Sequence, residues 1–239
     1  MSSPESIELL ISELVAANHV LANENVLDAF GHVSVRHPDR PGHFLLSCSR
    51  APELVSADDI LEYDDQSQPV TPLQGRALYI ERFIHGEIYR ARPDVHAICH
   101  HHAAAVMPFC ISGTPLVPVY QHGAFMGANV PFWDSQDEFG DTNLLLSNVD
   151  HGASLAHALG PDWCVLMRRH GATVAAVNLT ELVFRAVTSC LNAGFQYQSQ
   201  LLGKVDVLSP GEVAKAGLIA PSAMMRACDY WKSRLPTAA

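Results

Sequence analysis

The chain opens with apolar residues that recur every three or four positions. This period places them on one face of an α-helix, with polar side chains on the opposite face. Ser3 is suited to cap such a helix and Pro4 to its first position, because proline lacks the backbone N–H that would be left unpaired there. We therefore predict an amphipathic helix that runs to about Ala22. Its apolar stripe consists of Ile7, Leu10, Ile11, Leu14 and Val15.

Beyond this helix, short apolar runs alternate with segments of helical period. The strand-like runs cover residues 33–36, 44–47, 144–147, 163–168 and 174–177, and the helical segments cover residues 74–90, 150–159 and 178–202. The turn-rich sequence HPDRPG joins the first two runs and predicts a hairpin, and we expect more helix after Ser209. The strands outnumber what a helical bundle can hold. We predict one α/β domain over residues 1–239, with a mainly antiparallel or mixed sheet covered by helices.

Residues 97–103, with the sequence AICHHHA, have the character of a buried strand that carries three consecutive histidines. Because side chains alternate along a strand, His100 and His102 share one face and His101 lies on the other. Neutral imidazole is a common metal ligand, so two convergent imidazoles supply half of a typical site. Histidines satisfied within the core are the alternative. The spacing and the small residues that follow favour a metal, whose other ligands must come from elsewhere in the chain.

Composition narrows the class of protein. The formal net charge of −10 leaves no basic surface for a nucleic-acid backbone. The sequence shows neither a signal peptide nor an apolar run long enough for a membrane span, so we expect a cytoplasmic protein without a membrane partner. Its six cysteines are dispersed without metal-binding spacing, which favours reduced thiols. Thirteen histidines, partly clustered, fit a metal enzyme.

Three motifs in order along the chain carry a resemblance to a known family. The first is GHVSVR at residues 31–36, the second runs from EIYRARPDV at residues 87–95 into the three histidines, and the third is RHG at residues 169–171. In this combination the chain resembles the class II aldolase and adducin family over residues 7–202. The resemblance implies a three-layer α/β/α fold, one divalent metal ion and a homotetramer with sites at subunit interfaces.

The family's metal ligands fall on particular residues of this chain. Its two strand histidines correspond to His100 and His102, and its downstream histidine corresponds to His170. Its acidic residue falls on Glu81, which the resemblance makes either the fourth ligand or the catalytic acid/base. Such a set of imidazoles and a carboxylate is suited to zinc, manganese, iron or cobalt.

Departures from the family pattern point away from a phosphorylated substrate. Sugar-phosphate members of the family bind phosphate through an asparagine, a small polar loop and a pair of serines. Here those positions carry His32, the loop SCSRAP at residues 47–52 and the pair Tyr79-Ile80. A tyrosine and an isoleucine supply few of the small donors that a buried phosphate needs. We therefore expect a substrate other than a sugar phosphate.

The same positions suggest what binds instead. Arg50 lies in the loop after the second strand, and its planar guanidinium is suited to a carboxylate. Ser47 and Ser49 are candidates for hydroxyl contacts in this loop, beside His32. Arg36 is a further candidate for the substrate carboxylate. A surface ion pair is the alternative for both arginines, and for Arg36 it is an equal one. The expected partner is a small-molecule carboxylate.

Aromatic residues favour a flat substrate. Tyr79, Phe109 and the pair Phe132-Trp133 suit an aromatic acid, although each also fits the core. The chain resembles the branch of the family that decarboxylates hydroxypyridine dicarboxylates and hydroxyphthalates. We predict a lyase, namely a metal-dependent decarboxylase of a hydroxylated aromatic or heteroaromatic (di)carboxylate. An aldolase for a non-phosphorylated hydroxy-keto acid is the alternative, followed by a non-haem iron oxygenase and a metal-free binding module.

Decarboxylation requires a group that protonates the carbon from which carbon dioxide departs. Glu81, Tyr120 and His122 are the candidates, because a carboxyl, a phenol and an imidazole can each be tuned for this task beside a metal. Gly123 lets the backbone at His122 approach the site closely, which favours His122 over Tyr120. A structural turn explains this segment equally well.

Overall fold

The structure is a computed structural model in which residues 4–236 are described, so the expected N-cap Ser3 lies outside the described residues. The strands are β1 (His32–Arg36), β2 (Phe44–Ser47), β3 (Ile60–Tyr63), β4 (Ala97–His101), β5 (Phe132–Trp133), β6 (Cys164–Met167) and β7 (Gly171–Ala176). The α-helices are α1 (Pro4–Asn23), α2 (Arg82–Ala91), α3 (Met107–Ser112), α4 (Ser135–Phe139), α5 (Val149–Leu159), α6 (Leu179–Leu202), α7 (Pro210–Ala216) and α8 (Pro221–Ser233). Short 3-10 turns are η1 (Pro52–Leu54), η2 (Ala57–Asp59) and η3 (Gln121–Met126).

Within residues 4–236 the strands form one seven-stranded sheet in the order β3-β2-β1-β4-β7-β6-β5. Neighbouring strands are antiparallel except for β5 and β6, which are parallel. The predicted α/β fold with a mainly antiparallel, mixed sheet is therefore confirmed, and β1 and β2 pair as the expected hairpin. β4 lies at the centre of the sheet, and all five of its residues are buried.

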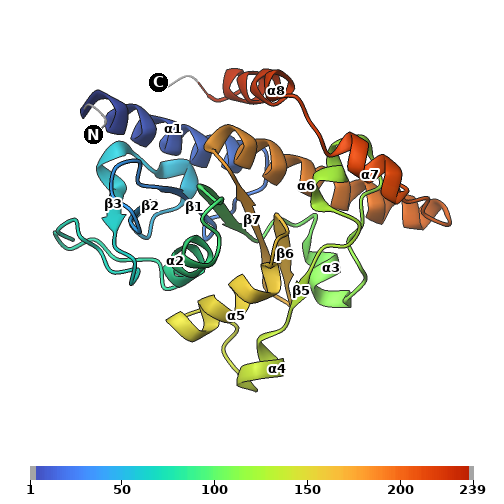
Figure 1. The fold of residues 1–239 in the computed structure, drawn as a ribbon, viewed down its shortest axis with the longest axis horizontal. Helices are drawn as coiled ribbons and strands as arrows, with labels where there is room; N and C mark the ends of the chain where they lie inside the picture. The colour runs from blue at the N-terminus through green and yellow to red at the C-terminus, as the bar shows by residue number, and fades with distance from the viewer. Residues whose placement is uncertain (1–3, 237–239) are drawn as a thin grey trace.

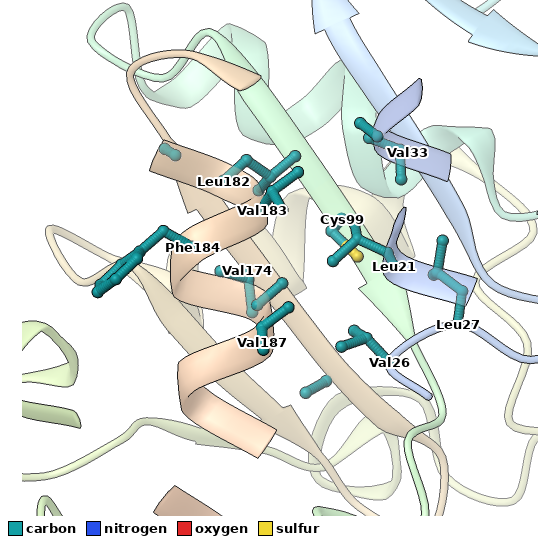
Figure 2. Packing of buried hydrophobic residues seen from close by; sticks show 14 of the residues in the cluster. Leu21, Val26, Leu27, Val33, Cys99, Val174, Leu182, Val183, Phe184 and Val187 are labelled. Atoms are coloured by element: carbon teal, nitrogen blue, oxygen red, sulfur yellow. The ribbon is translucent and has the colours of Figure 1, made fainter. Parts of the chain in front are cut away.

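Helices cover both faces of this sheet, which gives the expected three layers (Figure 1). On one face, α1 and α6 pack against Val33 of β1, Cys99 of β4 and Val174 of β7. Figure 2 shows this packing, with Leu182 and Val183 of α6 beside the strand residues. On the opposite face, α2 and α5 pack against each other and against the sheet. None of the helices in the described part of the chain combines the length and hydropathy that a membrane crossing requires.

The alternation of side chains decides which polar groups enter the α2 layer. Val33 and Val35 of β1 belong to the apolar cluster on the α1 side. Consequently His32 and Ser34 point to the opposite face, where both lie against His85 of α2. The functional side chains described below gather on this side and at the end of β4.

The predicted helix over residues 74–90 is wrong in its first half, because α2 begins only at Arg82. Gln74 and Gly75 both have positive φ angles, of 50° and 85°, which end any helical path there. The rest of the segment is a loop that lies against the β2 side of the sheet, where the backbone N–H of Ser49 donates to the carbonyl of Ala77. The helical spacing of apolar residues therefore continued N-terminally into a segment that the structure forms as a loop.

The predicted strand over residues 144–147 is also wrong. This segment is irregular, and Leu144 has a positive φ of 67°. Leu146 is fully buried, and its backbone N–H donates to Oε1 of Glu81 at 3.1 Å. The apolar run thus packs as a buried loop, and its backbone hydrogen bonds to a side chain instead of a neighbouring strand.

We expect Gly171→Ala to destabilise the fold, because its Cβ would clash with the His101 carbonyl of the paired strand and lie 2.9 Å from Cδ2 of His102. Overpacking of this kind costs about 1 to 3 kcal/mol of unfolding free energy. The matched control is Gly194→Ala, because a Cβ there meets nothing within 4 Å inside α6. That change should stabilise by about 0.5 to 1 kcal/mol.

Urea unfolding followed by circular dichroism measures both changes through the denaturation midpoint at constant m-value. An unchanged midpoint for Gly171→Ala would mean that β4 and β7 can separate here without cost.

Candidate metal centre

Four side chains from distant parts of the sequence meet at one end of the sheet. Glu81 immediately precedes α2, and His100 lies in β4. His102 follows β4 by one residue, and His170 immediately precedes β7, the antiparallel neighbour of β4. One ligand atom from each side chain lies within 4.8 Å of the others. The structure thus brings together the four residues predicted as metal ligands.

The ligand atoms face one another. Nε2 of His100 lies 3.0 Å from Nε2 of His102. The Glu81 carboxylate reaches two of the rings, with Oε2 at 3.6 Å from Nε2 of His100 and Oε1 at 3.4 Å from Nε2 of His170. The rings of His102 and His170 are nearly parallel, with centroids 5.1 Å apart. Three imidazole nitrogens and a carboxylate therefore converge on one small volume.

Further residues fix the orientation of these rings. Nδ1 of His102 lies 3.2 Å from Oδ1 of Asp28, and Nδ1 of His100 lies 3.2 Å from Oγ1 of Thr173. With Nδ1 engaged in this way, each ring turns Nε2 toward the centre. Within the described residues, Nδ1 of His170 is buried without a hydrogen-bond partner.

Asp28 is a residue that the sequence analysis missed. Desolvation raises the pKa of its carboxyl, but the backbone N–H of Phe30, the charge of His102 and the N–H of Gly31 outweigh this, so the pKa lies below the usual 3.8. Asp28 therefore stays ionised beside His102. In the sequence, an aspartate shortly before a glycine signals a turn, and nothing marks it as a partner of a histidine 74 positions away.

The donor set fits a divalent metal. His100 is fully buried, and this desolvation, together with the charges of His102 and His170, holds its pKa well below 6.5. The ring is therefore neutral, which is the form that binds metals. Borderline nitrogen donors with one carboxylate suit zinc, manganese, iron or cobalt.

The centre opens into a cavity of about 610 Å³. Glu81, His102 and His170 form one part of its wall. Of the predicted substrate-binding residues, His32, Ser49 and Arg50 line the cavity as well. The rest of the wall is mainly apolar and consists of Ala29, Phe30, Ala51, Leu78, Tyr79, Ile80 and Leu145.

Arg50 forms the ion pair that the sequence left as its alternative role, and it also lies in the cavity wall. Its Nε donates to the carbonyl of Leu54 at 2.6 Å and lies 3.2 Å from Oδ2 of Asp59. Both contacts use Nε, so the two terminal nitrogens are not needed to anchor the side chain. The residue thus forms an ion pair and still lines the cavity.

Tyr79 closes the wall next to this loop. Its hydroxyl donates to the backbone carbonyl of Arg50 and accepts from the backbone N–H of the same residue. Because these two hydrogen bonds satisfy the hydroxyl, Tyr79 contributes mainly its aromatic ring to the cavity wall. Ile80 adds an exposed aliphatic side chain at the mouth.

Two of the predicted substrate contacts are not brought to this cavity. The guanidinium of Arg36 donates to the backbone carbonyls of Val95, Tyr89 and Arg92 and therefore has a structural role. Ser47 is fully buried at the end of β2 and is not part of the cavity wall. Three backbone carbonyls bind the Arg36 guanidinium, so Arg36 makes neither the surface ion pair nor the substrate contact that the sequence suggested.

Tyr120 and His122 lie in another place. They line a second cavity of about 490 Å³ between η3, α6 and α8, which has no wall residue in common with the first. The Tyr120 hydroxyl donates to the carbonyl of Thr188 in α6 at 3.2 Å. Within one copy of the chain, neither residue stands beside Glu81.

The sequence and the fold can now be compared with known proteins. Residues 12–195 match the family described as the Class II Aldolase and Adducin N-terminal domain. The chain belongs to the class II aldolase and adducin family. The resemblance drawn from the three motifs is thereby confirmed.

Similar proteins and a similar solved structure agree with that assignment. Decarboxylase tropJ of Talaromyces stipitatus is 38% identical over 215 residues, which cover 84% of this chain and 80% of that protein. The 3,4-dihydroxyphthalate decarboxylase of Arthrobacter keyseri is 28% identical over 201 residues, covering 77% and 76%. Among solved structures, an L-fuculose 1-phosphate aldolase from Glaciozyma antarctica superposes with a TM-score of 0.79 at 22% identity, over 95% of this chain and 88% of that one. The last likeness shows the class II aldolase fold.

The first site prediction for this family member concerns metal affinity. Asp28→Asn removes the negative charge beside His102 and keeps the shape of the side chain. We expect the affinity for Zn²⁺ or Mn²⁺ to fall by about 10- to 100-fold, because a lost partner of a ligand histidine has this effect. His102→Ala removes a ligand outright and should lose most of the metal.

Competition against a chromogenic chelator measures these affinities. Asp137→Asn, on α4 and away from the centre, is the matched control and should bind metal like the natural protein. Full metal occupancy in purified His102→Ala would contradict the assignment of the centre.

Proposed function

We propose that this chain is a divalent-metal-dependent decarboxylase of a hydroxylated aromatic or heteroaromatic dicarboxylate. The observation that carries the proposal is the combination, in one cavity, of the histidine–glutamate centre, Arg50 and a mainly apolar wall. The family and the named decarboxylase relatives indicate a lyase. The metal and the substrate class are the further steps of the proposal.

His100, His102 and His170 would hold the metal ion, and the Glu81 carboxyl beside them would act as the acid. When bound, a divalent ion supplies Lewis acidity that stabilises negative charge on substrate oxygen atoms beside the breaking bond. The residues around the centre prepare for this: Asp28 and Thr173 orient two of the imidazoles, and Leu146 holds Oε1 of Glu81 through its backbone N–H.

The cavity wall supports an aromatic acid as substrate. Arg50 offers a planar set of donors to the carboxylate that is retained, and Ser49 lies next to it in the wall. Phe30 and Ile80 are 71% and 53% exposed, so substantial apolar surface borders the opening. Covering this surface with a flat ring removes it from water and favours binding.

The same wall argues against a sugar phosphate. A bound phosphate needs several hydrogen-bond donors, because an unpaired charged oxygen in a partly desolvated site is costly. The Tyr79 hydroxyl is occupied by the backbone of Arg50, and Ile80 has no polar group. These two residues stand where sugar-phosphate members of the family place small hydroxyls.

Glu81 is our candidate for the proton donor. When carbon dioxide leaves, the electrons of the broken carbon–carbon bond remain on the ring carbon, which then takes a proton. Leu146 engages Oε1 of Glu81, which leaves Oε2 to carry that proton and to regain one from water. We assign Tyr120 and His122 no role at the histidine–glutamate centre of their own chain, because they line a separate cavity. They could reach such a centre only in a second copy, across an interface between the two chains.

We expect the metal-loaded protein to release carbon dioxide from a hydroxylated phthalate or a hydroxypyridine dicarboxylate. Treatment with a chelator should abolish the activity, and added Zn²⁺, Mn²⁺, Fe²⁺ or Co²⁺ should restore it. A coupled assay for carbon dioxide, with product identification by mass spectrometry, measures the reaction. L-fuculose 1-phosphate and a 4-hydroxy-2-oxo acid serve as comparison substrates. Efficient cleavage of the phosphate, or preferred cleavage of the oxo acid to a carbonyl fragment, would refute the proposal in favour of an aldolase.

We expect Arg50→Ala to weaken binding or turnover of the dicarboxylate by at least tenfold, because an unpaired carboxylate in this setting costs roughly 2 to 5 kcal/mol. Arg50→Lys should be intermediate, since lysine keeps the charge but lacks the planar fork. Arg40→Ala is the matched control, because Arg40 pairs with Glu62 away from the cavity. Steady-state kinetics measure these effects. If Arg50→Ala has the same kcat and KM as the unsubstituted protein, Arg50 serves only in the ion pair with Asp59.

A further inference from the structure

A chain of buried hydrogen-bonding groups leads from the cavity wall into the protein. Nδ1 of His32 lies 2.7 Å from Nε2 of His85. Nδ1 of His85 lies 2.6 Å from Oγ of Ser34, which in turn lies 2.8 Å from the hydroxyl of Tyr89. All four residues are buried, His85 and Ser34 completely. Only His32 belongs to the cavity wall.

Both imidazoles in this chain are neutral. Burial lowers the pKa of His85 to about 3. His32 is almost as completely buried, which disfavours a charged ring, and its Nδ1 lies 2.7 Å from Nε2 of His85, so one of these two nitrogens carries a proton and the other a lone pair. A neutral imidazole carries one N–H and one lone pair, so each ring donates through one nitrogen and accepts through the other. The hydrogen bonds must therefore all run in the same direction along the chain.

The hydroxyl of Tyr89 sets that direction. It can donate to Ser34 at 2.8 Å or to the carbonyl of His96 at 3.5 Å. The shorter contact is the better hydrogen bond, because donation across 3.5 Å recovers little of the cost of burying a phenol. With Tyr89 donating to Ser34, the Ser34 hydroxyl donates to Nδ1 of His85.

The same logic continues to the cavity. His85 accepts at Nδ1, so its proton is on Nε2 and is donated to Nδ1 of His32. His32 then carries its own proton on Nε2. The ring of His32 stands between Tyr79 and His100, with centroid distances of 4.5 Å and 5.1 Å. An N–H group is thereby held at the cavity wall next to the metal centre.

We propose that the Nε2–H of His32 is a fixed hydrogen-bond donor for an anionic oxygen of the substrate, and that His85, Ser34 and Tyr89 are positioning residues that hold this tautomer. The identity of the anion as a ring carboxylate or its neighbouring oxygen rests on the proposed function. The tautomer of His32 does not depend on the proposed function. The opposite tautomer would turn a lone pair toward that oxygen and repel it.

This role differs from that of a general acid. A neutral imidazole that gave up its Nε2 proton would become an imidazolate unless a proton moved onto it along the chain at the same time, and the chain ends at the buried phenol of Tyr89. Burial raises the pKa of Tyr89, so a phenolate there is a poor end point for proton transfer. His32 therefore binds and orients, and the proton for the product comes from another group.

The tautomer can be read directly by nitrogen-15 NMR of protein labelled at histidine, with the His32 signals assigned by their loss in His32→Gln. We expect His32 to be protonated at Nε2 in the natural protein, and Tyr89→Phe to shift it toward the Nδ1–H form. Tyr63→Phe is the matched control, because Tyr63 is equally buried on the same face and, within the described residues, its hydroxyl has no hydrogen-bond partner. An Nδ1–H form in the natural protein, or an unchanged tautomer in Tyr89→Phe, would overturn the proposal.

Substitutions at His32 separate a donor from an acid. The amide nitrogen of glutamine can replace Nε2 of histidine, whereas that of asparagine reaches only the place of Nδ1. We expect His32→Gln to bind phthalate within about threefold of the natural protein and His32→Asn to lose about tenfold or more, since a hydrogen bond to a charged group has this weight. Titration calorimetry with phthalate as the probe measures both without turnover. Equal losses in the two variants would refute the donor role.

The two experiments also keep this inference apart from the proposed function. If the natural protein binds no phthalate and decarboxylates no hydroxylated phthalate, the proposed substrate class is wrong, while the NMR measurement still decides the tautomer of His32. If turnover is present, a rise in KM at constant kcat in Tyr89→Phe supports positioning. A loss in kcat alone, with KM unchanged, would contradict it.

Discussion

The antiparallel pairing of β4 with β1 on one side and β7 on the other positions the imidazoles of the candidate site. In this register His100 stands opposite His32, and His101 stands opposite Ala172. Because β7 begins at Gly171, His170 is carried to the end of β4 where His102 emerges. Glu81 completes the set from the start of α2, and this helix is fixed in turn by its packing against α5. A shift of one residue in either pairing would move the imidazoles to the opposite face and disperse them.

Burial of so many imidazoles imposes a second constraint, because a buried polar nitrogen without a partner costs free energy. The structure meets this cost in two ways. Thr173, Asp28 and His85 engage one nitrogen each on His100, His102 and His32. Nε2 of His100 and Nε2 of His102, by contrast, lie 3.0 Å from each other, where a cation could accept both lone pairs. The ring orientations that satisfy the fold are therefore the same orientations that prepare metal binding.

The spacing of apolar and polar residues along the sequence predicted those features of the site that depend on the repeat of a strand or a turn. The alternation in residues 97–103 was enough to put His100 and His102 on one face, and the hairpin followed from its turn sequence. His170 and Glu81 required the family resemblance, since only the completed sheet brings them to β4. Asp28 and His85 escaped notice because their roles depend on contacts across 74 and 53 positions, for which the sequence carries no local signal. Arg36, Tyr120 and His122 were assigned from residue type and local sequence, and within one copy of the chain the fold places them away from the cavity.

The connection between Tyr79 and Arg50 shows how one wall can change its ligand without a change of scaffold. Tyr79 replaces a small polar side chain of the sugar-phosphate pattern, and its hydroxyl is satisfied by both backbone polar groups of Arg50. These bonds remove a polar group from the cavity and, at the same time, fix the loop from which the Arg50 side chain reaches the wall. The guanidinium is steadied at its Nε by Leu54 and Asp59. Under the proposed function, loss of phosphate recognition and gain of a positioned carboxylate partner would thus be two consequences of the same packing, while the four candidate metal ligands keep their places.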